Sequence, residues 1–190
     1  MNVVKVTIDG DEFTVPDTLS VRKAALKNGI YIPGLCSHPE LNPFKPFNWS
    51  EAVWQGDRRV EHEGNPSLSP SETAVGVGED FPHCELCLVS VNDGPPQRAC
   101  TTGVEEGMRV RTTGDDLTAA RRESLKKILA NHPHACLTCA QREGCSRTDC
   151  SMNVPVEERC CELLGRCEIG KVADYIGIPT DTPAYKPAGI

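Results

Sequence analysis

Residues 84–94, CELCLVSVNDG, hold two cysteines three positions apart, directly around the start of a short apolar run. Apolar and β-branched side chains over residues 86–91 predict a strand, and the Asn-Asp-Gly sequence at 92–94 predicts the turn that ends it. A tight thiol pair therefore stands at the beginning of a predicted strand. Both the predicted fold and the predicted chemistry of the chain depend on this segment.

Short elements on either side of this segment predict a small sheet. Residues 3–8 (VVKVTI) and 12–15 (EFTV) are β-like runs around a turn, and residues 108–112 are a last strand. A short helix is predicted over residues 18–29. The order β, β, α, thiol-bearing loop, β, β is that of a β-grasp sheet, so we predict an α+β fold.

Two stretches carry helix signals. Residues 18–29 have Asp17 or Thr18 as the predicted N-cap and a glycine at the end. Residues 115–129 have acidic side chains in the first turn, lysines near the end and leucines on one side. We expect this second helix to pack against the sheet and to carry the chain toward its C-terminal cysteines.

Composition and charge exclude several classes of protein. With 16 Gly and 15 Pro among 190 residues, the chain is expected to be rich in loops. A net charge of −7 argues against nucleic-acid binding, which needs a surplus of Lys and Arg. No apolar stretch is long enough to span a membrane, and the N-terminal MNVVKVTIDGDE lacks the pattern of a signal peptide. We therefore expect a cytoplasmic protein.

Cysteine is the most informative residue type in this chain. An odd total of 11 thiols, without a secretion signal, indicates metal ligands rather than disulfides. Zinc and iron–sulfur clusters both take four protein ligands. One C-x2-C pair with two outlying thiols in the first half of the chain suits a two-iron cluster better than zinc, which usually takes two such pairs. The cysteines stand at positions 36, 84, 87, 100, 136, 139, 145, 150, 160, 161 and 167.

Several segments together resemble a known family. Residues 32–41 (IPGLCSHPEL), 84–94, 98–114 (RACTTGVEEGMRVRTTG) and 130–139 (ANHPHACLTC) resemble the plant-type ferredoxin domain and the adjoining cluster segment of the complex I large iron–sulfur subunit. The same pair of segments occurs in iron-only hydrogenases and in NAD-linked hydrogenase and formate dehydrogenase subunits. The resemblance covers about residues 1–36 and 83–140. It implies that a [2Fe–2S] cluster is held by Cys36, Cys84, Cys87 and Cys100.

The 47 residues between the first two of these cysteines depart from the family, which has a short loop there. We expect residues 42–82 to form an excursion from the cluster loop, with a hairpin over residues 53–60. The excursion contains both tryptophans, Trp49 and Trp54. They either form a small core of their own or anchor a partner subunit.

The C-terminal cysteines resemble a second cluster segment of the same family. The spacing His132-x3-Cys136-x2-Cys139-x5-Cys145 is similar to its pattern of one histidine and three cysteines for a [4Fe–4S] cluster. His134 is interpreted as a bystander. Beyond this point the family's continuation appears only after Cys167, so either Cys145 or Cys167 could complete the cluster of His132.

Counting extends this prediction. Seven cysteines remain after the [2Fe–2S] set, and with His132 they make eight ligands, enough for two [4Fe–4S] clusters. The alternative is one [4Fe–4S] cluster and four thiols that are free or bound to zinc. The division of ligands between the clusters is left open by the sequence. The eight predicted ligands are His132, Cys136, Cys139, Cys145, Cys150, Cys160, Cys161 and Cys167.

We therefore predict a β-grasp ferredoxin domain over residues 1–112, a small, mostly helical and irregular iron–sulfur domain over residues 113–178, and an extended arm over residues 179–190. No nucleophile–base pair, open metal site or nucleotide-binding motif is visible, so no catalytic residue is predicted.

The sequence predicts an electron-transfer subunit of a multi-subunit oxidoreductase. Its partners would be a flavin- or NAD(P)H-linked redox subunit and a further redox subunit, such as a hydrogenase, formate dehydrogenase or other reductase. Two alternatives are an iron–sulfur redox sensor and a zinc-stabilised interaction module.

Overall fold

The computed structural model describes residues 2–36, 52–55, 58–61, 83–146 and 148–186. The chain divides into two compact units, and the larger combines Met1–Glu40 with Cys84–Ile190. The smaller unit is Leu41–His83. Boundaries between the predicted ferredoxin domain, iron–sulfur domain and arm stay a prediction, because all three belong to the larger unit.

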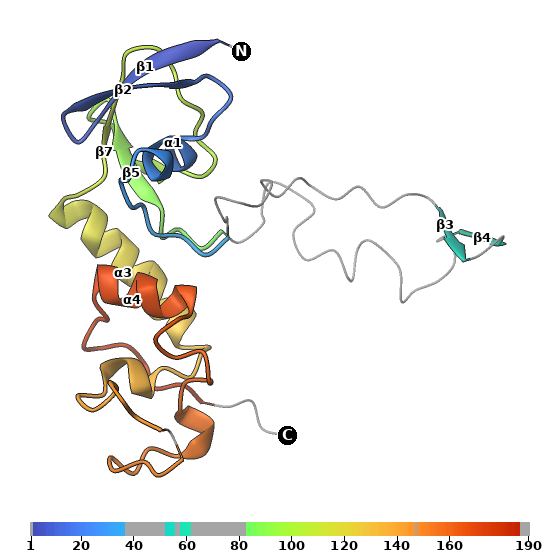
Figure 1. The fold of residues 1–190 in the computed structure, drawn as a ribbon, viewed down its shortest axis with the longest axis vertical. Helices are drawn as coiled ribbons and strands as arrows, with labels where there is room; N and C mark the ends of the chain where they lie inside the picture. Colours follow the sequence, from blue (N-terminus) through green and yellow to red (C-terminus); the bar gives the residue numbers. More distant parts are fainter. Residues whose placement is uncertain (1, 37–51, 56–57, 62–82, 147, 187–190) are drawn as a thin grey trace. The chain divides into compact units, whose positions relative to one another are not determined.

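The larger unit contains a five-stranded sheet, visible at the N-terminal end of the chain in Figure 1. The strand order is β2-β1-β7-β5-β6. The strands are β1 (Val3–Ile8), β2 (Asp11–Pro16), β5 (Leu88–Val91), β6 (Pro96–Arg98) and β7 (Met108–Arg111).

Strand pairing makes this sheet a mixed one. β1 and β2 form the predicted hairpin, in register from Val3 opposite Pro16 to Ile8 opposite Asp11. β1 pairs in parallel with β7, while β5 is antiparallel to both β6 and β7. β5 is buried along its whole length, as its apolar sequence predicts for a central strand. The sheet and its helices confirm the predicted α+β class.

Helix α1 (Val21–Lys27) covers the sheet with an apolar face. Val21, Ala24 and Ala25 are fully buried against the strands. The predicted N-cap at residue 17 or 18 is wrong: Ser20 caps the helix, and its hydroxyl accepts a hydrogen bond from the Lys23 amide at 3.3 Å. Residues 17–19 instead form the turn that leaves β2.

Two further helices, α3 (Asp115–Leu129) and α4 (Glu168–Ile176), define the C-terminal part of the larger unit, which we call the C-terminal lobe (residues 115–186). α3 has the predicted bounds, and its buried side chains include Leu117, Leu125 and Leu129. α3 and α4 lie side by side (Figure 1) and share one apolar core. Two short 3₁₀ helices, Ala135–Thr138 and Val156–Glu158, are the only other helical turns in the described part of this lobe.

A buried arginine joins α3 to the sheet. The Arg121 side chain is 2% exposed, and its guanidinium donates to the carbonyl oxygens of Leu88 (2.5 Å) and Thr112 (2.8 Å). Tyr175 of α4 also hydrogen-bonds to this guanidinium. Burial lowers the pKa of Arg121, because desolvation disfavours its charged form. One cation therefore links β5, the end of β7 and α4.

The smaller unit contains a separate two-stranded antiparallel sheet of β3 (Ala52–Gln55) and β4 (Arg58–Glu61). This pairing confirms the hairpin predicted over residues 53–60. Trp49, and with it the choice between a small core and a partner anchor, lies outside the described residues. Most of the predicted excursion over residues 42–82 does so as well.

The described part of the predicted arm, residues 179–186, contacts α3. Lys126 of α3 forms an ion pair with Asp181, and the Thr182 amide donates to the carbonyl oxygen of Pro179 at 3.1 Å. Within the described ranges, no helix has the length and apolar character needed to cross a bilayer.

Leu125 provides a test of the core between α3 and α4. Because its side chain is fully buried, we expect Leu125→Ala to lower the free energy of unfolding by about 2–5 kcal/mol. The measurement is the urea midpoint of the anaerobic protein, followed by circular dichroism. Lys127→Ala, two residues away on the exposed face, serves as the control and should change stability by less than about 0.5 kcal/mol. Equal effects of the two substitutions would contradict this packing.

Candidate iron–sulfur sites

The four predicted [2Fe–2S] ligands converge in the larger unit. The sulfurs of Cys36 and Cys84 lie 3.4 Å apart. The Cys100 thiol hydrogen-bonds with both Cys36 and Cys87. Four sulfurs from three separate chain segments therefore form one connected group, two of them just before β5 and one just after β6. The structure brings together the whole set that the sequence predicts.

Backbone hydrogen bonds hold these segments against one another. The Leu35 amide donates to the sulfur of Cys84 at 3.4 Å, which ties the loop before Cys36 to the paired thiols. The Ala99 amide donates to the carbonyl oxygen of Cys87 at 3.0 Å, which places Cys100 beside it. The convergence of the sulfurs thus follows from strand-like contacts at the end of the sheet.

Arg22 supports the loop that carries Cys36. Its side chain is 4% exposed, and its Nε donates to the carbonyl oxygen of Ile32 at 3.1 Å. Its Nη2 donates to the carbonyl oxygen of Gly34 at 3.4 Å, while its backbone amide donates to the carbonyl oxygen of Ala99 at 2.9 Å. A Cβ on Gly34 would stand 3.0 Å from the guanidinium, so the close approach favours glycine there.

The four thiols of this group differ in pKa. The hydrogen bond from Cys100 lowers the pKa of Cys87 to about 7, with the nearby Arg22 charge acting in the same direction and burial opposing it. The hydrogen bond with Cys36, followed by burial, raises the pKa of Cys84. Metal ligation needs thiolates, and the hydrogen bond from Cys100 favours that form at Cys87.

The donor set fits a [2Fe–2S] cluster. Such a cluster takes four cysteine thiolates, and the four sulfurs present here form one partly buried group. Within the described residues, no three His, Cys, Asp or Glu side chains are arranged around a single metal ion.

The second group of cysteines is spread through the C-terminal lobe. Four of its sulfurs accept a backbone amide hydrogen bond at 3.4 Å, from a residue two to four positions further along the chain. Such N–H···S bonds orient ligand sulfurs and tune the potential of iron–sulfur clusters. The four sulfurs belong to Cys139, Cys150, Cys161 and Cys167.

The remaining predicted ligands differ in exposure. Cys136 and Cys160 contact each other in the lobe's apolar core, and burial, followed by the charge of Cys136, raises the pKa of Cys160 to about 11. His132 has its Nδ1 buried without a hydrogen-bond partner, whereas the ring of His134 contacts the His132 carbonyl oxygen at 2.8 Å. This contact agrees with a bystander role for His134. Cys145 is exposed.

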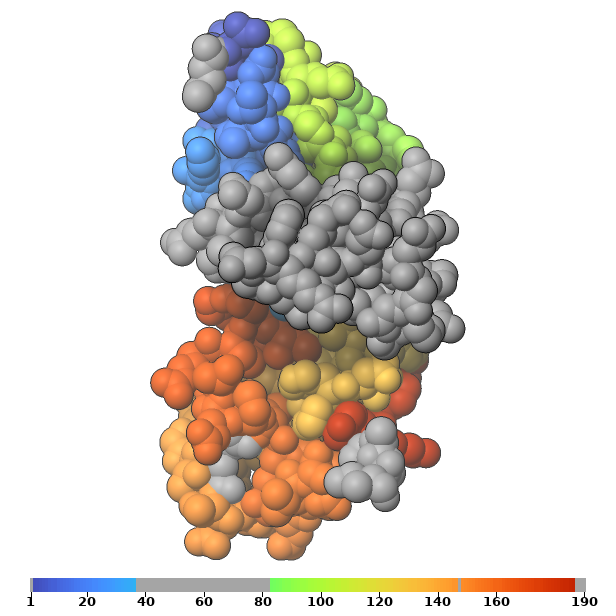
Figure 2. All heavy atoms as spheres, turned by 90° about the vertical axis from the view of Figure 1, so that its right-hand side faces the viewer, coloured from blue at the N-terminus to red at the C-terminus, as the bar shows by residue number. Residues whose placement is uncertain are grey.

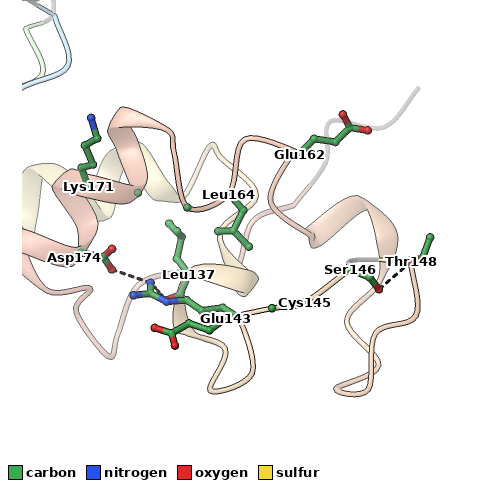
Figure 3. A pocket seen from close by; sticks show the side chains of 13 residues that line it. Leu137, Glu143, Cys145, Ser146, Thr148, Glu162, Leu164, Lys171 and Asp174 are labelled. Atoms are coloured by element: carbon green, nitrogen blue, oxygen red, sulfur yellow. Dashed lines mark hydrogen bonds and ion pairs between the residues drawn. The ribbon is translucent and has the colours of Figure 1, made fainter.

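Cys145 lines an open pocket of about 830 Å³ (Figure 3). Leu137 and Leu164 contribute its apolar wall. Across the pocket, Arg142 donates to the carboxylate of Asp174 at 2.8 Å and ties the loop before Cys145 to α4. The pocket therefore lies between the loop over residues 142–146, which carries Cys145, and the loop over residues 162–165, which follows Cys161.

Both groups of cysteines border the same apolar core. Leu86 and Cys84 from the first group pack into the core that contains Leu125, Cys136 and Cys160. On its other side, the first group reaches the core of the sheet through Cys87 and Cys100. An edge-to-face contact of Tyr31 with Tyr175, with ring centroids 4.9 Å apart, also joins the loop before Cys36 to α4. The predicted [2Fe–2S] ligands thus lie at the junction of the two cores.

Two supporting residues, Arg22 and Arg121, were missed from the sequence. Arg22 follows Val21 and precedes Ala24 and Ala25 on a short apolar helix, and an arginine in such a setting signals a buried cation. No comparable local signal distinguishes Arg121 from the other charged residues of α3.

Comparison with known proteins bears on the first site. Residues 60–115 match the model of the 2Fe–2S iron–sulfur cluster binding domain, and this range includes Cys84, Cys87 and Cys100. Over these residues the chain is similar to that domain. The resemblance predicted from the sequence is confirmed. Cys36 lies outside the matched residues, and its place in the site comes from its contacts.

Related proteins extend over more of the chain than this domain. A putative formate dehydrogenase of Staphylococcus haemolyticus is 25% identical over 78% of this chain, which spans 11% of that protein. An NADH-quinone oxidoreductase subunit of Rickettsia bellii is 27% identical over 77% of this chain, which spans 16% of it. The chain is therefore similar to a small part of each of these larger proteins.

A solved structure is similar in fold to nearly the whole chain. The crystal structure of an NAD⁺-reducing [NiFe]-hydrogenase in its H₂-reduced state aligns with a TM-score of 0.56 and 22% identity. The alignment covers 98% of this chain and 55% of the hydrogenase chain. This similarity extends the shared fold from the sheet into the C-terminal lobe.

The charge of Arg22 gives a testable property of the first site. A buried cation beside the ligands favours the more negative, reduced cluster, so we expect Arg22→Met to lower the midpoint potential of the [2Fe–2S] centre. Potentiometric titration followed by electron paramagnetic resonance measures this shift. Lys27→Met, on the exposed end of the same helix, is the control and should leave the potential unchanged. An unchanged potential in Arg22→Met would show that its charge does not act on the cluster.

Proposed function

We propose that this chain is an iron–sulfur electron-transfer subunit of a multi-subunit oxidoreductase. Cys36, Cys84, Cys87 and Cys100 hold its [2Fe–2S] cluster, and the eight predicted ligands of the C-terminal lobe hold two [4Fe–4S] clusters. The protein works in solution and relays electrons between a flavin- or NAD(P)H-linked subunit and a further redox subunit.

The shared apolar core is the observation that carries this proposal. Cys160 belongs to it, and Cys84 and Cys136 pack against it. Leu86 and Leu125, both fully buried, belong to the same core. A packed, water-free medium between two clusters lets electrons pass while it protects the reduced centres from side reactions with solvent.

Relatives support the same role. They include a putative formate dehydrogenase, a subunit of NADH-quinone oxidoreductase and, by fold, an NAD⁺-reducing hydrogenase. All three names describe redox proteins that act on different substrates. A segment shared among them suits electron relay better than recognition of any one substrate.

The clusters supply one-electron chemistry when they are bound. The chain's own residues position the sulfurs, exclude water and donate N–H···S hydrogen bonds. Arg22 and Arg121 add buried positive charge near the first site, and Tyr31 packs the loop before Cys36 against α4. No side chain is assigned a role in bond making or breaking.

The partner subunits provide the direct test of this function. We expect the tagged chain, purified without oxygen from its native cells, to retain a flavoprotein, and the complex to be reduced by NADH or NADPH. The isolated chain should show the same clusters but no reduction by either nucleotide. Reduction of the isolated chain by NADH or NADPH, or purification of a metal-loaded chain that retains no redox protein, would contradict the proposal.

Iron removal tests the coupling of the clusters to folding. Between α3 and α4, the described residues of the C-terminal lobe form only two short 3₁₀ helices. Metal–thiolate bonds must therefore stabilise much of this region. We expect anaerobic chelation to raise hydrogen exchange first over residues 132–167, while β1, β2 and α1 keep their protection. Mass spectrometry of exchanged peptides gives this order. A lobe that stays protected without iron would overturn the prediction.

A further inference from the structure

Cys160 is held in the core of the C-terminal lobe, beside Cys136. Its side chain is 4% exposed, and its thiol hydrogen-bonds with that of Cys136. The backbone amides of Cys136 and Leu137 donate to the Cys160 sulfur, which also lies 3.4 Å from the carbonyl oxygen of Pro133. Cys160 is therefore fixed at the start of the 3₁₀ helix that carries Cys136, although the two residues are far apart in sequence.

An unpaired histidine nitrogen lies in the same stretch of chain. His132 immediately precedes Pro133, and its Nδ1 is buried without a hydrogen-bond partner. Burying an unsatisfied polar nitrogen costs about 1–3 kcal/mol, so such an atom calls for a ligand or another partner. The neighbouring His134 is already engaged with the His132 carbonyl oxygen. His132 is thus the imidazole with a free buried nitrogen in the segment that leads to Cys136, and Cys160 contacts this segment at Pro133.

Cys161 lies in a different environment from its neighbour. It is exposed, and its sulfur accepts a hydrogen bond from the Leu163 amide instead of from the 3₁₀ helix. Cys145, also exposed, resembles Cys161 and not Cys160 in this respect. Figure 2 shows the segment that carries these two cysteines, in orange, on the surface of the lobe.

We infer that Cys160 is a ligand of the cluster held by His132 and Cys136, and that the adjacent Cys161 and the exposed Cys145 bind the other [4Fe–4S] cluster. This inference rests on the proposed iron–sulfur function and assigns ligands within it. The assignment differs from the ligand pattern that the family resemblance implies, because that pattern makes Cys145 a ligand of the same cluster as His132.

The assignment gives the two clusters different surroundings. The cluster with His132 lies in the core that also receives Cys84, so it is the partner of the [2Fe–2S] centre. The other cluster, with exposed ligands, faces the surface and is the one that exchanges electrons with a further subunit. The order of the relay is therefore [2Fe–2S], histidine-ligated [4Fe–4S] and surface [4Fe–4S].

Histidine ligation provides a spectroscopic label for this test. The full-length chain, labelled with ¹⁵N-histidine and reduced without oxygen, is measured by pulsed electron paramagnetic resonance. One cluster signal should couple to a histidine nitrogen, and His132→Cys should abolish that coupling. We expect Cys160→Ala to lose about four irons per chain together with the nitrogen-coupled signal.

Cys161→Ala is the matched control, because it removes an identical side chain one residue away. It should also lose about four irons per chain but keep the nitrogen-coupled signal, and Cys145→Ala should do the same. The [2Fe–2S] signal reports on folding in every variant. Cys160→Ser, which keeps a side chain of the same shape with oxygen as the ligand atom, replaces Cys160→Ala if truncation disturbs the lobe, and it should shift the nitrogen-coupled signal alone.

A nitrogen-coupled signal that survives unchanged in both Cys160 variants would overturn the assignment, and so would its loss in Cys161→Ala or Cys145→Ala. Complete absence of iron–sulfur signals from the unmodified protein is a different result. It would refute the proposed function, whereas the first two results leave that function intact.

Discussion

The meeting of four thiols at the end of one small sheet is the constraint on which the rest of the structure depends. Cys36 and Cys84 are 48 positions apart in sequence, yet their sulfurs lie 3.4 Å apart. The sheet brings Cys87 and Cys100 to the same place through β5 and β6. Metal–thiolate bonds at this point would join Cys36 to Cys84 and so close the 47-residue segment between them. The strands of the sheet would not have to move for this.

The position of this site between two cores links folding to function. Cys87 and Cys100 border the core of the sheet, while Cys84 borders the core of the C-terminal lobe. Arg121 reinforces the junction by bonding to carbonyl oxygens of β5 and of the residue after β7. Breaking such a buried interaction leaves polar groups unsatisfied. We therefore expect the sheet and α3 to keep a fixed position relative to each other. A fixed junction would keep the spacing between the proposed redox centres constant.

Local patterns were sufficient to predict much of the fold and the first site. Alternating β-branched residues predicted the β1–β2 hairpin, and acids, lysines and leucines at helical spacing predicted α3 with its observed bounds. The resemblance to the ferredoxin family implied the first ligand set, and the structure brings these four thiols together. The N-cap of α1 was misplaced, because several residues before the helix have side chains that can cap it and only the path of the chain selects Ser20.

Other features depend on contacts between distant segments, which local patterns do not specify. Cys160 and Cys161 are identical neighbours, and only the fold gives one of them a buried contact with Cys136 and leaves the other exposed. The Arg22 side chain donates to carbonyl oxygens 10 and 12 positions away in the sequence. The Arg121 side chain donates to carbonyl oxygens 9 and 33 positions away. These pairings arise from tertiary structure, so local sequence patterns could not supply them.

The central claim is that these cysteines bind iron and inorganic sulfide as clusters. The most direct measurement is the iron, zinc and acid-labile sulfide content of the full chain, prepared without oxygen. The account predicts about ten irons and about ten sulfides per chain, for one [2Fe–2S] and two [4Fe–4S] clusters. Zinc in place of iron, or metal without sulfide, would contradict it.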